Sequence, residues 1–63
     1  MSKQVQHYTV EADRETGEWI TEPQHVGAVE LIEWNERQDT DDVHFDTYEK
    51  DDETRAIEVR WVD

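Results

Sequence analysis

Histidine and carboxylate side chains are the groups in this chain best suited to chemistry, because together they bind zinc and other divalent ions. His44 and Asp46 are two residues apart, and on a strand this spacing places both side chains on one face. A neighbouring strand that carries His7 could bring a third group opposite them. The spacing fixes no complete ligand set, so the sequence favours ordinary surface histidines and no bound cofactor. The candidate metal ligands are His7, His44 and Asp46.

Two acidic runs have part of the pattern of a calcium-binding loop. Residues 39–42 (Asp-Thr-Asp-Asp) begin in the manner of an EF-hand loop, which needs an oxygen ligand at its fifth position and glycine at its sixth. Val43 and His44 occupy those positions, so the pattern fails. Residues 51–53 (Asp-Asp-Glu) are too few to enclose an ion. Both runs are therefore predicted to be solvated turns.

The arrangements typical of enzymes are missing from the sequence. Ser2 is the only serine and there is no cysteine, so no recognisable nucleophile–histidine–acid pattern is present. Gly17 and Gly27 are the only glycines, which excludes a glycine-rich phosphate-binding loop. A 63-residue domain also has little volume for a substrate pocket of several hundred Å³. We therefore expect a protein that is not an enzyme.

The clearest predicted element is a C-terminal antiparallel hairpin formed by residues 43–49 and 54–62. Apolar and polar residues alternate in both segments, which is typical of strands with one buried face. The polar residues 50–54 between them have the composition of a turn. The buried positions are expected to be Ile57, Val59 and Trp61, and the outward-facing ones Glu58 and Arg60.

A second hairpin is predicted at the N-terminal end, from residues 4–12 and 18–21. Tyr8 and Val10 would share one face of its first strand. Asp13 can accept hydrogen bonds from the following turn residues, and Gly17 can adopt the left-handed conformation that closes a bulged hairpin.

Residues 26–35 fit either a strand or a helix. A strand would carry apolar side chains on both faces, as a central or interface strand does. A helix is supported by residues 21–24, which have the form of a capping box with Pro23 in the first turn. Gly27 would cost that helix about 1 kcal/mol, so the strand is favoured.

The predicted fold class is therefore all-β. We expect a small antiparallel meander of four to five strands, either barrel-like or an open sheet, built largely from β-branched and aromatic residues. The alternative is an α+β fold, in which the same sheet carries one helix at about residues 22–36.

Several large apolar residues lie where both faces of a strand are apolar, so a partner could cover one face. Packing within the core is the simpler interpretation. The expected partner is a second copy of the chain, in a twofold dimer, or an unknown protein. The candidate interface residues are Trp19, Val29, Leu31 and Trp34.

Composition limits the size, the partners and the compartment. The 63 residues form one small acidic domain, residues 1–63, with 18 acidic and 6 basic residues and a net charge of −12. Such a surface lacks the basic face needed to bind nucleic acid directly, and no apolar run approaches the roughly 20 residues of a membrane span. No apolar segment typical of a signal peptide follows Lys3, so we expect a cytoplasmic protein.

The acid surplus, with only two lysines, resembles the composition of proteins from cytoplasms at molar salt. The expected function is thus that of a small acidic binding or accessory protein of a halophile-type cytoplasm, with its partner unknown. The alternative is a decoy that imitates phosphate charge and occupies a DNA- or RNA-binding protein. Nine of the acids lie in residues 36–53. A decoy needs its acids on one face, whereas salt adaptation spreads them over every exposed face.

Stability is expected to depend on salt. At a net charge of −12, repulsion is stronger in the folded chain than in the expanded unfolded chain. The Debye length falls from about 30 Å at 0.01 M salt to about 3 Å at 1 M. The melting temperature should therefore rise between about 0.05 M and 2 M potassium chloride, which circular dichroism can follow. A melting temperature that stays flat over this range would contradict the expectation.

Overall fold

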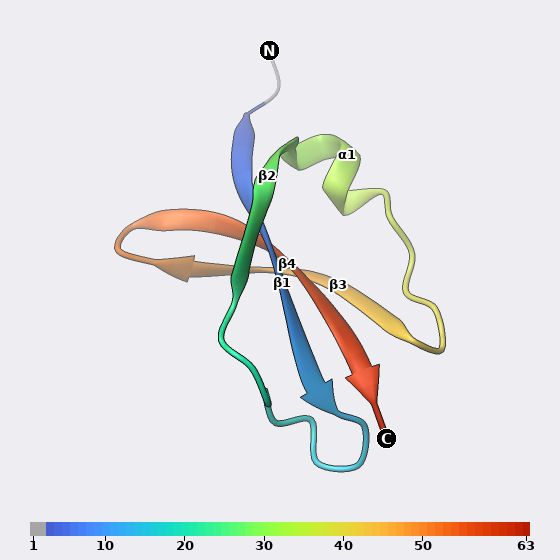
Figure 1. Cartoon of the computed structure of the whole chain (residues 1–63). Coiled ribbons are helices and arrows are strands. Elements are labelled where there is room, and N and C mark those ends of the chain that lie inside the picture. Colours follow the sequence, from blue (N-terminus) through green and yellow to red (C-terminus); the bar gives the residue numbers. More distant parts are fainter. Residues whose placement is uncertain (1–2) are drawn as a thin grey trace.

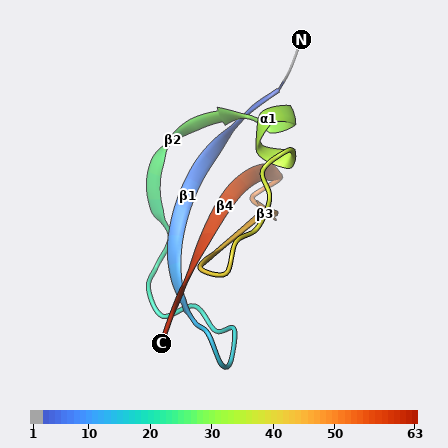
Figure 2. The same cartoon turned by 90° about the vertical axis from the view of Figure 1, so that its right-hand side faces the viewer.

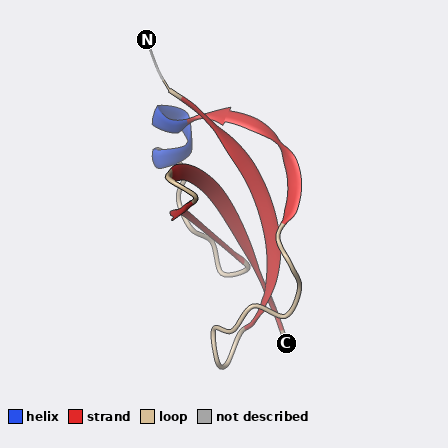
Figure 3. Ribbon diagram, turned by 90° about the vertical axis from the view of Figure 1, so that its left-hand side faces the viewer, coloured by secondary structure: helices blue, strands red, loops and turns tan. Residues whose placement is uncertain are grey.

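The computed structural model describes residues 3–63, which form a four-stranded sheet and one short helix (Figure 1). The sheet is strongly curved, and the helix lies on one side of it (Figures 2 and 3). It does not close into a barrel. In chain order the elements are β1 (Gln4–Asp13), β2 (Gln24–Glu30), α1 (Leu31–Asn35), β3 (Val43–Lys50) and β4 (Glu53–Val62).

The centre of the sheet is a parallel pair, β1 and β4, in the strand order β2-β1-β4-β3. Each central strand pairs antiparallel with the other strand of its own hairpin, β1 with β2 and β4 with β3. The prediction of a mainly β fold with four strands is confirmed, but an entirely antiparallel meander is wrong. The segment with α1 carries the chain from one edge of the sheet to the other, so the two hairpins meet through β1 and β4.

The sheet has a hydrophobic cluster on each face. We call the face covered by α1 the helix face. Val29, Leu31 and Phe45 pack against the buried cluster on this face. We call the other face the loop face, because residues of the β1–β2 loop pack on it, with the Trp19 ring 5.9 Å from the Tyr48 ring. The buried residues of the helix face are Val5, Trp34 and Ala56, and those of the loop face are Val10, Ala12, Ile57 and Val59.

Trp34 holds α1 on the sheet. The helix has five residues and no side-chain hydrogen bond at its N-cap, so its own backbone contributes little stability. Trp34 is 1% exposed, and its indole N–H donates to the backbone carbonyl of Asp46, 2.8 Å away. Its ring meets the Phe45 ring edge-on at 5.3 Å, and the guanidinium of Arg37 covers it at 4.7 Å. These contacts, rather than helix propensity, position α1.

The C-terminal hairpin is confirmed, with a tighter turn than expected. Asp51 and Asp52 both have positive φ, 54° and 63°, as in the two-residue turns that match the twist of a hairpin. The burial prediction is right for Ile57 and Val59, while Trp61 is half-buried. It is wrong for Glu58, which is 8% exposed, because β4 is a central strand and both of its faces are covered.

The N-terminal hairpin forms with a later second strand. The turn is as predicted. Asp13 Oδ1 accepts the backbone N–H groups of Glu15 and Thr16, and Gly17 has a φ of 78°. Residues 18–21 do not form the second strand and make one isolated bridge, between Ala12 and Trp19. The ladder begins at Gln24, one residue after Pro23, which lacks the N–H that a ladder needs.

Residues 26–35 contain both of the expected structures. The segment is strand as far as Glu30 and helix from Leu31 to Asn35. The alternative prediction of a helix at residues 22–36 is therefore right only for residues 31–35. Val29 still packs on the helix-face cluster from β2. The chain must then leave the edge of the sheet for Trp34 to reach the same cluster, and the helical turn provides that change of direction.

Replacing Trp34 by alanine should leave the protein largely unfolded. Removing a buried tryptophan costs about 3–5 kcal/mol, which is close to the whole stability of a small domain. Trp19→Ala is the matched control, because Trp19 is 46% exposed and should cost much less. Urea unfolding followed by circular dichroism measures both. A Trp34→Ala variant as stable as Trp19→Ala would contradict this packing.

Candidate functional site

His44 lies between two carboxylates on the loop face. Its Nδ1 is 2.5 Å from Asp39 Oδ2, and its Nε2 is 3.4 Å from Asp46 Oδ2. The other oxygen of Asp39 accepts the backbone N–H of Phe45 at 2.9 Å, so the loop before β3 is fastened to the strand. The imidazole ring stacks on Trp61, with 6.3 Å between ring centres. His44 and Asp46 do share a face of one strand, as the spacing predicts.

These contacts change the ionisation of the cluster. The hydrogen bond to Asp39 raises the pKa of His44, burial opposes this rise, and the longer contact with Asp46 adds a smaller rise. The hydrogen bond from the backbone N–H of Phe45 lowers the pKa of Asp39, and the hydrogen bond with His44 lowers it further. A protonated imidazole donates from both nitrogens and has no lone pair left for a metal ion. The geometry therefore suits an ionic clasp on the loop better than a metal site.

His7 lies on the opposite face and does not join the other two candidate ligands. Its ring is 4.6 Å from the Trp34 ring, and its Nε2 is 3.4 Å from Oε1 of the buried Glu58. Burial lowers the pKa of His7 despite the opposing effect of Glu58. The second oxygen of Glu58 is 2.7 Å from Arg60 Nη2. Within residues 3–63, no three His, Cys, Asp or Glu side chains are arranged to hold a metal ion.

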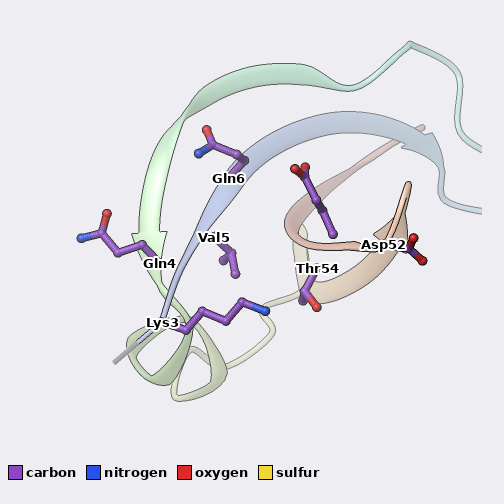
Figure 4. A pocket seen from close by; sticks show the side chains of 7 residues that line it. Lys3, Gln4, Val5, Gln6, Asp52 and Thr54 are labelled. Carbon is purple, nitrogen blue, oxygen red and sulfur yellow. The ribbon is translucent and has the colours of Figure 1, made fainter. Parts of the chain in front are cut away.

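A polar hollow lies where β1 begins beside the β3–β4 turn (Figure 4). Lys3 extends towards Thr54, while Asp52 points away. Amide groups of Gln4 and Gln6 line the remaining side. These groups do not converge on one point, so the hollow offers no catalytic arrangement.

The structure separates the four candidate interface residues. Trp34 is in the core, and Val29 and Leu31 are half-buried against the helix-face cluster. Trp19 alone of the four is exposed. Reasoning from the sequence missed three other exposed apolar side chains. Among the residues that the structure describes, the large exposed apolar side chains are Trp19, Ile20, Val26 and Ile32, with exposures between 46% and 60%.

All four of these side chains lie within residues 19–32, on β2 and the segments beside it. We call this set, Trp19, Ile20, Val26 and Ile32, the β2 flank. Charge marks the same region, because residues 19–32 contain two charged side chains, Glu22 and Glu30, in a chain that is 38% charged. This low charge is the signal in the sequence that could have identified the surface.

The two edges of the sheet differ in the same way. β2 forms one edge, and residues 23–29 contain no Asp, Glu, Lys or Arg. β3 forms the other edge and carries Asp46, Glu49 and Lys50. Charges on edge strands normally prevent association with another chain. β3 has three such charges, whereas β2 has one, Glu30 at its end, together with the irregular register opposite His7 and Tyr8.

Most of the acids gather in three segments at the connections between the strands. Residues 13–22, 36–42 and 49–53 hold four acids each, which is 12 of the 18. The three segments lie on three different sides of the sheet in Figure 1. The acidic segments are thus distributed around the sheet.

Comparisons with known proteins give no relatives: no family model, no curated protein and no solved structure matches the chain. Within the described residues, no helix has both the length and the apolar character needed to cross a membrane.

His7 and His44 should have pKa values on opposite sides of 6.5, the ordinary pKa of a histidine. His44 should titrate above it, so its clasp adds stability below pH 6.5 that is lost as pH rises through the folded-state value. His7 should titrate below it, so the fold loses stability as pH falls through 6.5. NMR titration of the imidazole protons measures both groups.

Asp39→Asn provides the control for this titration. It should lower the pKa of His44 and leave that of His7 in place, because His7 lies on the other face. A common pKa for both histidines in the parent protein would contradict the two environments.

Proposed function

We propose that the protein is a small, non-enzymatic binding protein that associates with a second copy of itself through the β2 flank. One observation carries the proposal: the four large exposed apolar side chains all fall within residues 19–32, on an edge strand whose one charged residue is Glu30 at its end and on the segments that flank it. Single exposed apolar residues are ordinary on protein surfaces, but a concentration of them in one segment is typical of an interface.

Charge supports a second copy as the occupant. Two chains of −12 repel each other wherever their acidic loops meet. The β2 flank would let one copy approach another with few facing carboxylates, since Glu22 and Glu30 are the acids in residues 19–32. A twofold arrangement would place the same surface on both partners. Burial of the flank would also supplement the core of a domain of this size, which is small.

The acidic loops fit a cytoplasm at molar salt, where hydrated carboxylates keep a protein dissolved and salt screens their repulsion. A decoy for a nucleic-acid-binding protein is less well supported, because it needs the acids gathered on one face. Four acids in each of three separated segments do not favour it.

Sedimentation at about 2 M potassium chloride tests the proposal, a concentration at which the repulsion between copies is screened. The parent protein should sediment as a dimer of the 7.6 kDa chain. Val26→Glu places a carboxylate on the flank and should give a folded monomer, since Val26 is exposed, with a melting temperature lowered only by the loss of the dimer. Thr47→Glu adds the same charge to the other edge strand, β3, and should remain dimeric.

Two results would contradict the proposal. One is a parent protein that remains a monomer up to about 1 mM, because a dimer weaker than this has little binding energy. The other is a dimer that Val26→Glu leaves intact, because the contact would then lie elsewhere on the surface.

A further inference from the structure

Both tyrosines of the chain lie on the loop face, one on either side of Arg55. Arg55 on β4 pairs in register with Tyr48 on β3. Its guanidinium carbon is 5.3 Å from the centre of the Tyr8 ring, which β1 contributes from the other side. Three adjacent strands therefore form a floor of two phenol rings with a guanidinium group between them.

Other side chains turn this floor into a hollow of about 390 Å³. Glu22 and Pro23 of the β1–β2 loop line one side of it, and Lys50 lines another. Trp19 of the same loop packs edge-on against Tyr48 at 5.9 Å, so the loop wall is held against the sheet. The volume lies in the range of sites for small organic ligands.

The charge of this hollow differs from that of the rest of the surface. The chain has three times as many acidic as basic side chains, yet the residues lining the hollow include two bases and one acid. Lys50 forms no ion pair within residues 3–63. Arg55 has Glu53 at 3.6 Å from Nη2, and a side-chain hydrogen bond with Tyr48 raises its pKa. Its Nε is buried without a hydrogen-bond partner among the described residues, so a ligand in the hollow would have to meet the outer Nη groups of the guanidinium.

We infer that this hollow binds a small organic anion, with its carboxylate or phosphate group held by Arg55 and Lys50 and its flat body packed against Tyr8 and Tyr48. A planar guanidinium matches the two oxygens of such a group, and lysine adds a point charge. The aromatic contacts do not depend on charge, so binding persists where salt screens the ion pairs. The hollow adjoins the β2 flank, because Trp19 packs on Tyr48, but none of its lining residues belongs to the flank and it does not require self-association.

NMR titration with three probes tests the inference. Benzoate and phenyl phosphate carry the same ring with different oxyanions, and benzamide is the neutral analogue of benzoate. At a fixed salt concentration at which the protein is folded, at least one anion should give saturable shifts in the amides of residues 8, 48, 50 and 55. Benzamide should bind at least about tenfold more weakly, since a charged hydrogen bond is lost. The tighter of the two anions identifies the carboxylate or the phosphate as the group recognised.

Variants assign the effect to the two bases. Arg55→Gln should weaken binding of the preferred anion by about tenfold or more, and Lys50→Gln, on the exposed rim, by a smaller factor. Lys3→Gln removes a positive charge outside the hollow and is the matched control, with binding unchanged. If Arg55→Gln does not fold, Lys50→Gln decides.

The inference is overturned by any of three results: no saturable shift with either anion up to about 20 mM, benzamide binding as well as benzoate, or binding that survives loss of the basic side chains in folded variants. The same titration on the Val26→Glu monomer should give the same affinities, which keeps this test independent of the proposed dimer.

Discussion

The rest of the structure depends on the parallel pairing of β1 and β4 at the centre of the sheet. Central strands are covered on both faces, and four consecutive residues of β4, Ala56 to Val59, are buried. A chain of 63 residues has little material with which to form two covering layers. It uses a five-residue helix on one face and the loop between β1 and β2 on the other. Trp34 and Trp19 are the side chains that bring these two covers to the sheet.

The net charge determines where the remaining features can lie. Most acids occupy the loops around the sheet, and ion pairs hold some of these loops together. Arg14 binds side-chain oxygens of Asp42 and Asp63 at 3.1 and 2.8 Å and the backbone carbonyl of Asp41 at 2.7 Å. It thereby connects the β1–β2 turn, the loop before β3 and the C-terminal residue. Residues 19–32 and the lining of the tyrosine-lined hollow each contain fewer acids than these loops.

Local patterns in the sequence predicted the local structure well. The period-two alternation of residues 43–62 and the Asp13 and Gly17 turn signals follow from backbone geometry within a few residues. The parallel pair could not be predicted, because no local pattern states which strand lies beside which at a sequence distance of about 50 residues. The burial of Glu58 follows from that pairing. A polar residue that alternates with apolar ones is predicted to face solvent, and this prediction fails when the strand is central and covered on both faces.

The candidate sites show the same limit. His44 and Asp46 are close because two residues on one strand must share a face, and the sequence contains that information. His7 is on the opposite face because of the register between β1 and β4, which the sequence does not reveal. Likewise, Tyr8, Tyr48 and Arg55 come from three separate strands and have no common spacing. Their convergence becomes visible only once the strand order is known.

Amide hydrogen exchange tests the central parallel pair most directly, because protection reports the stability of each strand's hydrogen bonds. If β1 and β4 are the shared centre, their amides should exchange slowest and at similar rates, with Val10 and Ile57 among the most protected. β2 and β3, each with one open edge, should exchange faster. Strong protection in the β3–β4 hairpin combined with edge-like exchange throughout β1 would contradict the account, because the two hairpins would then not be joined through β1 and β4.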